Sequence, residues 1–471
     1  MAHPLTRLRT AQGLSHADYA RLVARTHAEL GLGQMAARRE KVSRWESGRT
    51  VPEHTAQLAM ARIHGVPADE VRRLGWPHWL HLVLSDAVLL DQAYTDRGAE
   101  LALHGTLHLR KGPSTPALLL RGAALAAQTR SALALITAPD RRPDAEGRSP
   151  SAEQLQWCEA RIAALERHEA GTAVPAATLY RAARAEHRLV VRLLGVGGAD
   201  APTSRRLFAL AARTALLCTW LSSALGEEAR AERYNLAAVR AAAAAAEPAL
   251  ATAAFTQLAL RHVIAGDPAD ALALVRAAGD AGSGPLPATA VPVRLVEALA
   301  FARQGCATDA ARALDRAAVT AAPGPHPHPH PHPAPAPDDP SGTAALARAV
   351  TVARAQAALF LGAPREARSY FETLTDSLLA PRAIDPSPHT GVWLLYATDV
   401  HLELGEVDLA ARAVHRAVNA IGLLPSGLAR QYRQRLAHHA REPAVRRALV
   451  HLTDLPKTSG TSCNSGCPGV H

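Results

Sequence analysis

The chain has 471 residues, of which 48% are hydrophobic and only 4% aromatic, and its formal net charge is +10. A chain of this length is too long to fold around a single hydrophobic core, so we expect two or three domains. The apolar fraction is too high for an intrinsically disordered chain. Most apolar side chains are Ala and Leu, and alternating strand patterns are scarce. Because Ala is the strongest helix former, this composition predicts an all-α protein.

Cysteine content and apolar runs indicate the compartment. The five cysteines are sparse and the N-terminus lacks an apolar signal region, which favours a reducing compartment over a disulfide framework. The most apolar run, residues 215–224, is shorter than the ~20 residues that cross a bilayer. We therefore expect a cytoplasmic protein that does not enter a membrane.

The stretch 38–52 predicts a short helix with two faces. Val42 and Trp45 are three residues apart, so they point together toward a core. Basic side chains lie off this apolar line and can face outward: Arg39, Lys41 and Arg44. A helix with an apolar back and a basic front suits the major groove of DNA.

The same stretch predicts how this helix ends. Gly48 follows the last apolar residue, where glycine commonly terminates a helix. Arg49 and Thr50 come next in a loop, and Pro52 stands where the next helix opens, a position at which the missing N–H of proline costs nothing.

The pattern Val-Ser-Arg-Trp-Glu-x-Gly-Arg-x-x-Pro at residues 42–52 resembles the recognition helix and following loop of Xre/Cro/lambda-repressor-like helix-turn-helix regulators. Residues 5–15 resemble the first helix of these regulators and the cap of the second, residues 18–23 the second helix, and residues 58–67 the fourth. The resemblance implies a five-helix, lambda-repressor-like DNA-binding domain over residues 1–80. It also implies binding to double-stranded DNA as a homodimer.

Carried over position by position, the resemblance implies a set of DNA-binding residues. These are Ser15, His16, Arg38, Arg39, Glu40, Lys41, Ser43, Arg44, Ser47, Arg49 and Thr50. Within the set, Arg39 and Arg44 are expected to read base edges. Ser15 and His16 are expected to contact a phosphate, and the loop 47–50 is expected to grip the DNA backbone.

Two further residues match a structural pair in these regulators. Arg9 and Glu46 are expected to join the first helix to the recognition helix, for stability rather than for DNA contact. The segment 26–35 is an insertion relative to the compact turn of these regulators. It predicts an extended second helix followed by a loop hinged at glycine.

The first 80 residues contain twelve Arg or Lys and seven Asp or Glu, a net charge of +5, which suits a modest DNA-binding surface. Trp76 and Trp79 are expected to pack onto the helical core of this domain. Connecting helices are predicted over 81–138, at residues 83–93 and 116–136 with a Gly-interrupted polar stretch between them. The Pro-containing stretch 139–151 predicts a linker.

From residue 152 to 455 the sequence repeats a pattern in which a glycine ends one helix and an alanine follows five residues later inside the next. The pairs are Gly226/Ala231, Gly266/Ala271, Gly305/Ala310, Gly362/Ala367 and Gly405/Ala410. The pattern resembles that of tetratricopeptide-like (TPR) arrays and implies an α-solenoid of helical hairpins. Such solenoids present a concave face to a peptide, a partner protein or a second copy.

Two low-complexity segments interrupt or follow the repeats. Residues 323–341 alternate His and Pro, which predicts an exposed polyproline insertion rather than a metal cage. Residues 456–471 are rich in Gly and Ser and predict a disordered tail, in which Cys463 and Cys467 lack the second pair of ligands that zinc needs. We expect no metal site and no cofactor.

The sequence lacks a phosphate-binding loop, a zinc-protease motif and a nucleophile elbow, so we expect no enzyme. The main hypothesis is a bacterial transcriptional regulator of the actinobacterial Xre type, nucleoid-associated when bound to DNA. Its helical-repeat body would dimerise or sense a peptide, small-molecule or protein signal. The alternative, favoured by the insertion at 26–35, is a TPR-like interaction adaptor with a vestigial helix-turn-helix head.

Overall fold

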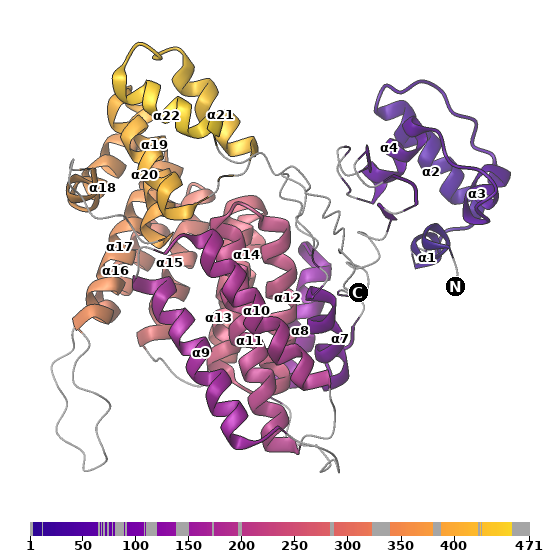
Figure 1. The fold of residues 1–471 in the computed structure, drawn as a ribbon, viewed down its shortest axis with the longest axis horizontal. Helices are drawn as coiled ribbons and strands as arrows, with labels where there is room; N and C mark the ends of the chain where they lie inside the picture. The colour runs from indigo at the N-terminus through magenta and orange to yellow at the C-terminus, as the bar shows by residue number, and fades with distance from the viewer. Residues whose placement is uncertain are drawn as a thin grey trace, which may run out of the picture.

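The computed structural model describes residues 3–11, 13–64, 92–107, 120–137, 150–171, 174–195, 200–282, 287–322, 340–379, 388–422 and 426–454, with isolated positions between them. These described residues form 20 helices and no strand, which confirms the predicted all-α fold. A small N-terminal group of helices stands to one side of a larger helical body (Figure 1).

The N-terminal domain contains α1 (Pro4–Ala11), α2 (His16–Glu29), α3 (Arg39–Glu46) and α4 (His54–Ile63). Helix α2 begins at a capping box, in which the side chain of Ser15 accepts from the backbone of Asp18 and the Asp18 carboxylate accepts from the backbone of Ser15. The apolar faces of the four helices meet in one core that includes Leu5, Tyr19, Val23, Val42, Trp45 and Met60.

The segment after α4 completes this core. Trp79 is fully buried in it and its indole N–H donates to Oε1 of Gln57 at 3.2 Å. Trp76 packs edge-on against Trp79, with ring centroids 6.0 Å apart. The expectation that these two tryptophans pack onto the helical core is confirmed. The expected domain was to contain five helices and to end at residue 80, and the structure describes only scattered positions of residues 65–80.

The insertion between α2 and α3 has the predicted form. Helix α2 continues to Glu29, and the following loop, residues 30–38, contains Gly31 and Gly33 at φ of 68° and 95°. These left-handed conformations are accessible to glycine at little cost. His27, in the last turn of α2, donates from Nδ1 to the carbonyl oxygen of Gly33 at 2.9 Å. The loop is therefore fastened to the helix that precedes it.

Helices α7 (Asp96–Thr106) and α8 (Gly122–Ile136) precede the body. The predicted Gly-interrupted stretch contains a helix of its own, because α7 runs through Gly98 and Gly105 and begins at a Thr95 side-chain cap. Both helices share a hydrophobic cluster with the body, so α7 and α8 do not form a separate core. Most of the predicted helix 83–93, residues 116–119 of the second predicted helix, and most of the linker 139–151 lie outside the described residues.

The body consists of antiparallel helical hairpins. In order they are α9 (Ala152–Gly171) with α10 (Ala176–Gly195), α11 (Ala201–Ala224) with α12 (Glu228–Ala245), α13 (Pro248–Ala265) with α14 (Pro268–Ala281), α15 (Pro287–Arg303) with α16 (Ala307–Ala321), α17 (Pro340–Phe360) with α18 (Pro364–Leu379), α19 (Pro388–Glu403) with α20 (Val407–Ile421), and α21 (Ser426–Ala437) with α22 (Pro443–Asp454). The hairpin array expected from the repeated glycine and alanine pattern is confirmed from α11 to α20.

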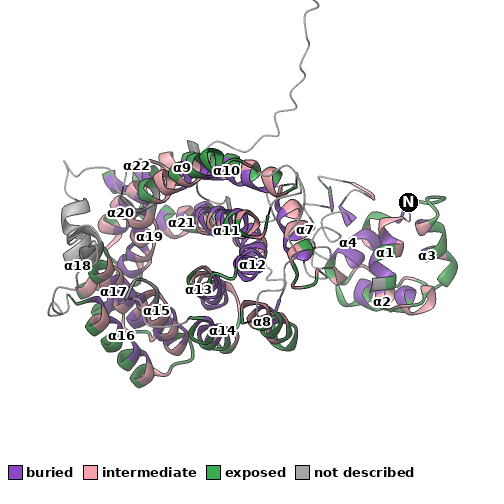
Figure 2. Cartoon of the chain, turned by 90° about the horizontal axis from the view of Figure 1, so that it is seen from below, coloured by how far each residue is buried: buried purple, intermediate pink, exposed green. Residues whose placement is uncertain are grey.

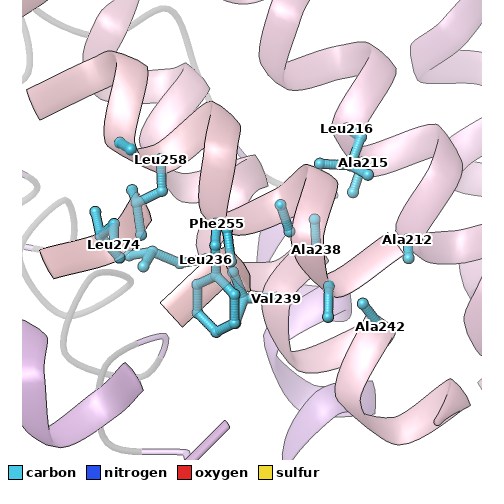
Figure 3. Close-up of a cluster of buried hydrophobic side chains, with 14 of the residues drawn as sticks. Ala212, Ala215, Leu216, Leu236, Ala238, Val239, Ala242, Phe255, Leu258 and Leu274 are labelled. Atoms are coloured by element: carbon cyan, nitrogen blue, oxygen red, sulfur yellow. The ribbon is translucent and has the colours of Figure 1, made fainter. Parts of the chain in front are cut away.

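Each repeat glycine lies in the turn of a hairpin, and each repeat alanine is buried in the second helix. The exposed fractions are 0% for Ala231, Ala271, Ala367 and Ala410 and 1% for Ala310. Seven residues before each glycine, the side chains of Thr219, Ala259, Ala298, Ala355 and Thr398 are also fully buried. Small side chains at both positions let the paired helices approach closely, and larger ones such as Phe255 and Leu258 fill the gaps between hairpins (Figure 3).

The array closes on itself. One hydrophobic cluster joins Tyr180 of α10 and Leu217 of α11 to Val414 of α20 and Val445 of α22, residues 197 to 265 positions apart. At the contact between the ends, a Cβ added to Gly422 would stand 3.0 Å from Pro175. Seen end-on, α11, α13, α15 and α19 surround the axis of the body, while α14, α16 and α20 lie outside them (Figure 2).

Within the described part of the chain, α11 alone is long and apolar enough to cross a membrane, and most of it is buried inside the body. The buried residues include Leu210, Ala211, Leu217 and Cys218, which makes α11 a core helix of the solenoid. The predicted His-Pro insertion at 323–341 and the predicted tail at 456–471 lie outside the described residues, apart from the first residues of α17.

Candidate DNA-binding surface

Helix α3 has one buried face and one exposed face. Val42 and Trp45 are 0% and 6% exposed and lie in the core of the N-terminal domain. Arg39, Ser43 and Arg44 are exposed. The helix forms the outer edge of the domain in both views (Figures 1 and 2). The sequence folds in this way because the two large apolar residues hold α3 in place and leave its polar side chains to the solvent.

Cationic side chains gather on and around this exposed face. Among the described residues, Arg38, Lys41, Arg44 and Arg49 form no ion pair and no side-chain hydrogen bond, whereas arginines of the body such as Arg206 and Arg213 pair with glutamates. Unpaired guanidinium and ammonium groups produce a local positive potential, and they can be transferred to phosphate or base acceptors without breaking a contact within the protein.

Arg39 has an acidic neighbour on the same surface. Its Nε lies 3.2 Å from Oε1 of Glu40, and the two side chains are 76% and 59% exposed. A hydrogen bond from the backbone N–H of Glu40 itself, followed by one from Arg39, holds the pKa of the Glu40 carboxyl below its ordinary value. Such an exposed pair contributes little to stability, so Arg39 can leave Glu40 for a guanine, and the ionised Glu40 can accept from a cytosine amino group.

Arg9 and Glu46 are brought together as a buried pair. Arg9 donates from Nε to Oε1 of Glu46 at 2.6 Å and from Nη2 to Oε2 at 3.1 Å, and from Nη1 to the carbonyl oxygen of Leu14. Burial alone would raise the pKa of Glu46, but hydrogen bonds from Arg9 and His16 outweigh burial and hold that pKa below its ordinary value. The ionised pair ties α1 and the start of α2 to the end of α3.

The two residues expected to contact phosphate at the start of α2 are engaged within the protein. Ser15 caps α2 through Asp18. His16 turns toward α3, with Nε2 3.0 Å from Oε2 of Glu46, and its side chain is 40% exposed. The structure thus adds His16 to the Arg9–Glu46 pair. A phosphate contact by His16 would require its ring to leave Glu46 or to use the opposite edge.

The loop after α3 is shaped by Gly48, whose φ of 71° is left-handed. The backbone N–H groups of Ser47 and Arg49 donate to the carbonyl oxygens of Ser43 and Arg44, which folds the loop back over the last turn of α3. Ser47, Arg49 and Thr50 are exposed. Arg49 therefore stands beside α3 at its C-terminal end, displaced from the exposed face that carries Arg44.

Two histidines of this domain were missed by the sequence reasoning. His27 fastens the loop 30–38 through Gly33. His64 follows α4, where its Nε2 lies 2.8 Å from the hydroxyl oxygen of Tyr19, and burial lowers the pKa of His64 to about 4. Neither residue matches a motif, and the only signal for them is a polar side chain at a position that the helical periodicity turns inward.

The described residues contain no group of three or more His, Cys, Asp or Glu side chains placed to hold a metal ion. The three described cysteines, Cys158, Cys218 and Cys306, are all free, and burial raises the pKa of the Cys218 thiol to about 12. A thiol with so high a pKa is a core side chain rather than a nucleophile.

Residues 1–74 match the family described as a helix-turn-helix domain. The match covers α1 to α4 and includes every residue of the surface described above. The long all-helical region that follows lies outside the match. The comparison with curated proteins found no match.

Proposed function

We propose that this protein is a sequence-specific transcriptional regulator that binds double-stranded DNA through α3. The observation that carries the proposal is the two-faced helix: Val42 and Trp45 anchor it, while Arg38, Lys41 and Arg44 project from it without partners in the described chain. In this proposal α3 lies in the major groove, and Arg39 and Arg44 pair with guanine edges.

The other expected DNA-binding residues are proposed to position the protein on the DNA. Arg49, Ser47 and Thr50 hold the DNA backbone beside the C-terminal end of α3, and Ser15 does so at the start of α2. Phosphate contacts of this kind fix the register of a protein on DNA without reading its sequence. The Arg9–Glu46–His16 cluster holds α3 at a fixed angle to α1 and α2.

The helical-hairpin body is proposed to be TPR-like and to act as the regulatory part. It would join two copies into a homodimer, so that two α3 helices read half-sites about one DNA turn apart, and it would receive the signal that controls binding. This assigns the protein to the bacterial cytoplasm and to the nucleoid when it is bound. The plan is similar to that of Xre-type regulators.

Binding of full-length protein to mixed-sequence duplex DNA provides the first test. We expect retention at low salt that falls steeply as salt rises, because released counterions drive the association. The matched control is Arg130→Ala, which removes an exposed arginine from α8 of the body. That control should bind as wild type does, whereas the double variant Arg44→Ala/Arg49→Ala should bind more weakly.

The adaptor function remains the second candidate, because the loop 30–38 replaces a compact turn before α3. It predicts that wild type and the double variant bind DNA equally weakly. That result, with normal helical content in both proteins, would contradict the proposed regulator.

A further inference from the structure

The body encloses a cavity of about 560 Å³ on the inner side of its closed array. Nearly all of its lining comes from the first helix of successive hairpins, α11, α13, α15, α17, α19 and α21. Several of these helices surround the axis of the body in Figure 2. The cavity exists because the array closes, which brings α19 and α21 opposite α11 and α13.

Most of the wall is apolar. Helices α15 and α17 supply aliphatic side chains, among them Leu295, Leu299 and Val352. On the other side, Trp220 of α11 packs against His389 of α19 with ring centroids 4.0 Å apart, and His389 is followed by Trp393 at 6.5 Å. A lining that combines aliphatic groups with a row of rings suits a flat apolar body.

Polar groups gather at one end of the cavity. Arg261 of α13 is only 3% exposed and its Nη1 lies 3.1 Å from Oε2 of Glu228. Tyr396 of α19 lies within electrostatic reach of Arg261, Glu228 and Asp399, and burial raises the pKa of its hydroxyl to about 12. Asp399 is itself paired with Arg435 at 3.0 Å. Glu228 and Asp399 are thus each paired with an arginine. No unpaired charge is left at this end of the cavity to neutralise a charged ligand.

Four polar side-chain atoms at the same end have no hydrogen-bond partner among the described residues, and two of them, Nη1 of Arg261 and Oε2 of Glu228, face each other as an ion pair. The other two, the carbonyl Oε1 of Gln257 and the Nε–H of Arg261, are buried without a hydrogen bond. One is an acceptor and the other a donor, and they lie one helical turn apart on α13. Buried polar groups are normally satisfied, so this pair points to an occupant that supplies both a donor and an acceptor.

We propose that the cavity binds an uncharged small molecule with a flat apolar body and one polar head, such as a carboxamide, that both donates and accepts hydrogen bonds. The volume lies within the ~300–1,000 Å³ of small-molecule sites. The head meets Gln257 and Arg261, and the body lies between Trp393 and the aliphatic side chains of α15 and α17. A bound peptide fits less well, because its backbone carries polar groups at every residue and the apolar wall leaves them unpaired.

This inference identifies the class of molecule that the regulatory body would sense. It rests on the proposed function only where ligand binding is expected to change DNA binding. Binding itself is measured without DNA. Equilibrium dialysis of full-length protein against naphthalene-2-carboxamide should give one molecule per chain, with a dissociation constant below about 1 mM for a ligand of this size. 2-Acetylnaphthalene lacks the donor and should bind about fivefold more weakly, as expected for one lost hydrogen bond.

The matched variants are two substitutions on α17. Ala349→Trp fills the cavity, which Ala349 lines, whereas Ala347→Trp adds the same side chain at an exposed position two residues earlier. We expect Ala349→Trp to lose binding at least about tenfold and Ala347→Trp to bind as wild type does. Gln257→Leu offers a second variant of nearly unchanged shape, and it should remove the preference for the carboxamide over 2-acetylnaphthalene.

Three results would overturn the proposal: no saturable binding of the carboxamide, equal binding by Ala349→Trp with its helical content intact, or binding of a random hexapeptide pool that Ala349→Trp abolishes while the carboxamide does not bind. None of these results depends on DNA. A failure of the cavity proposal is therefore distinguishable from a failure of DNA binding by α3.

Discussion

At the scale of single residues, Arg44 and Arg49 stand in different surroundings although both are exposed and unpaired within the described chain. In sequence, Arg44 lies between the anchoring residues Val42 and Trp45. Those two side chains are buried, whereas Arg44 projects from the opposite, exposed face of α3. Arg49 lies in the loop that Gly48 turns back beside that helix. Two cations of the same type are therefore expected to make different contacts, one with base edges and the other with phosphate.

Replacement of Arg44 by Ala should cost ~1–3 kcal/mol of binding to the preferred duplex and relax base preference at one position, because a bidentate contact to guanine is lost. Fluorescence anisotropy with the preferred duplex and its single-base variants measures both effects. Arg130→Ala on α8 serves as the control. Unchanged affinity and unchanged preference in Arg44→Ala would remove this residue from the DNA surface.

Replacement of Arg49 by Ala should weaken binding to all duplexes alike. A lost phosphate contact also lowers the slope of log affinity against log salt concentration by about 1. Titrations at several salt concentrations with preferred and unrelated duplexes measure that slope. A change confined to one sequence would show that Arg49 reads bases instead.

His64 makes the stability of the N-terminal domain depend on pH. Burial lowers its pKa from 6.5 to about 4 in the folded domain. Between these values the unfolded chain binds a proton that the folded domain does not, so stability is greatest above pH 6.5 and falls as the pH drops toward 4. Hydrogen-exchange protection of α2 and α4, corrected for intrinsic rates, should follow this course. His64→Gln should flatten it and the exposed control His54→Gln should not.

At the scale of elements, the helices of the N-terminal domain could be predicted because each carries a local signature. Val42 and Trp45 define one face of α3, and Gly48 ends the helix. The extra residues 26–35 indicate that the connection between α2 and α3 is longer than a compact turn. Helix α7 could not be predicted in this way, since two glycines read as interruptions. Gly98 is required by the backbone just before the helix, because a Cβ at this position would meet the carbonyl oxygen of Ala93, five residues earlier, at 1.9 Å.

The loop 30–38 offers a prediction at this scale. His27→Ala removes the hydrogen bond to Gly33 and leaves the remainder of α2 intact. We expect faster amide exchange in the loop and, if the loop positions α3, a DNA affinity lower by about fivefold, the equivalent of one hydrogen bond. His54→Ala, at an exposed position, is the matched control. Faster exchange with unchanged affinity would show that the loop does not position α3.

At the scale of the whole molecule, the glycine and alanine repeat was sufficient to predict a stack of hairpins, because each hairpin obeys a local packing rule. Closure of the stack could not be predicted. It depends on Tyr180 and Leu217 meeting Val414 and Val445, and contacts between residues 197 to 265 positions apart leave no local pattern in the sequence. The cavity could not be predicted for the same reason, since nearly all of its lining comes from six helices that are far apart in the sequence.

On the candidate DNA-binding surface too, local features could be predicted from the sequence and contacts between distant elements could not. The exposure of Arg39 and Arg44 follows from helical periodicity, and the Arg9–Glu46 contact was expected from the resemblance. The inward turn of His16 was not expected, because it depends on the position of Glu46 at the far end of α3. Residues whose role depends on a neighbour from a distant element are the ones that a motif describes least well.

The central claim is that α3 reads DNA sequence, and selection of bound duplexes from a randomised pool tests it most directly. Full-length wild type and the double variant Arg39→Ala/Arg44→Ala would be compared at near-physiological salt. We expect a motif that is enriched by wild type and lost in the double variant, with twofold symmetry if the protein binds as a dimer. Equal, weak retention of unrelated duplexes by both proteins, with no enriched motif, would contradict it.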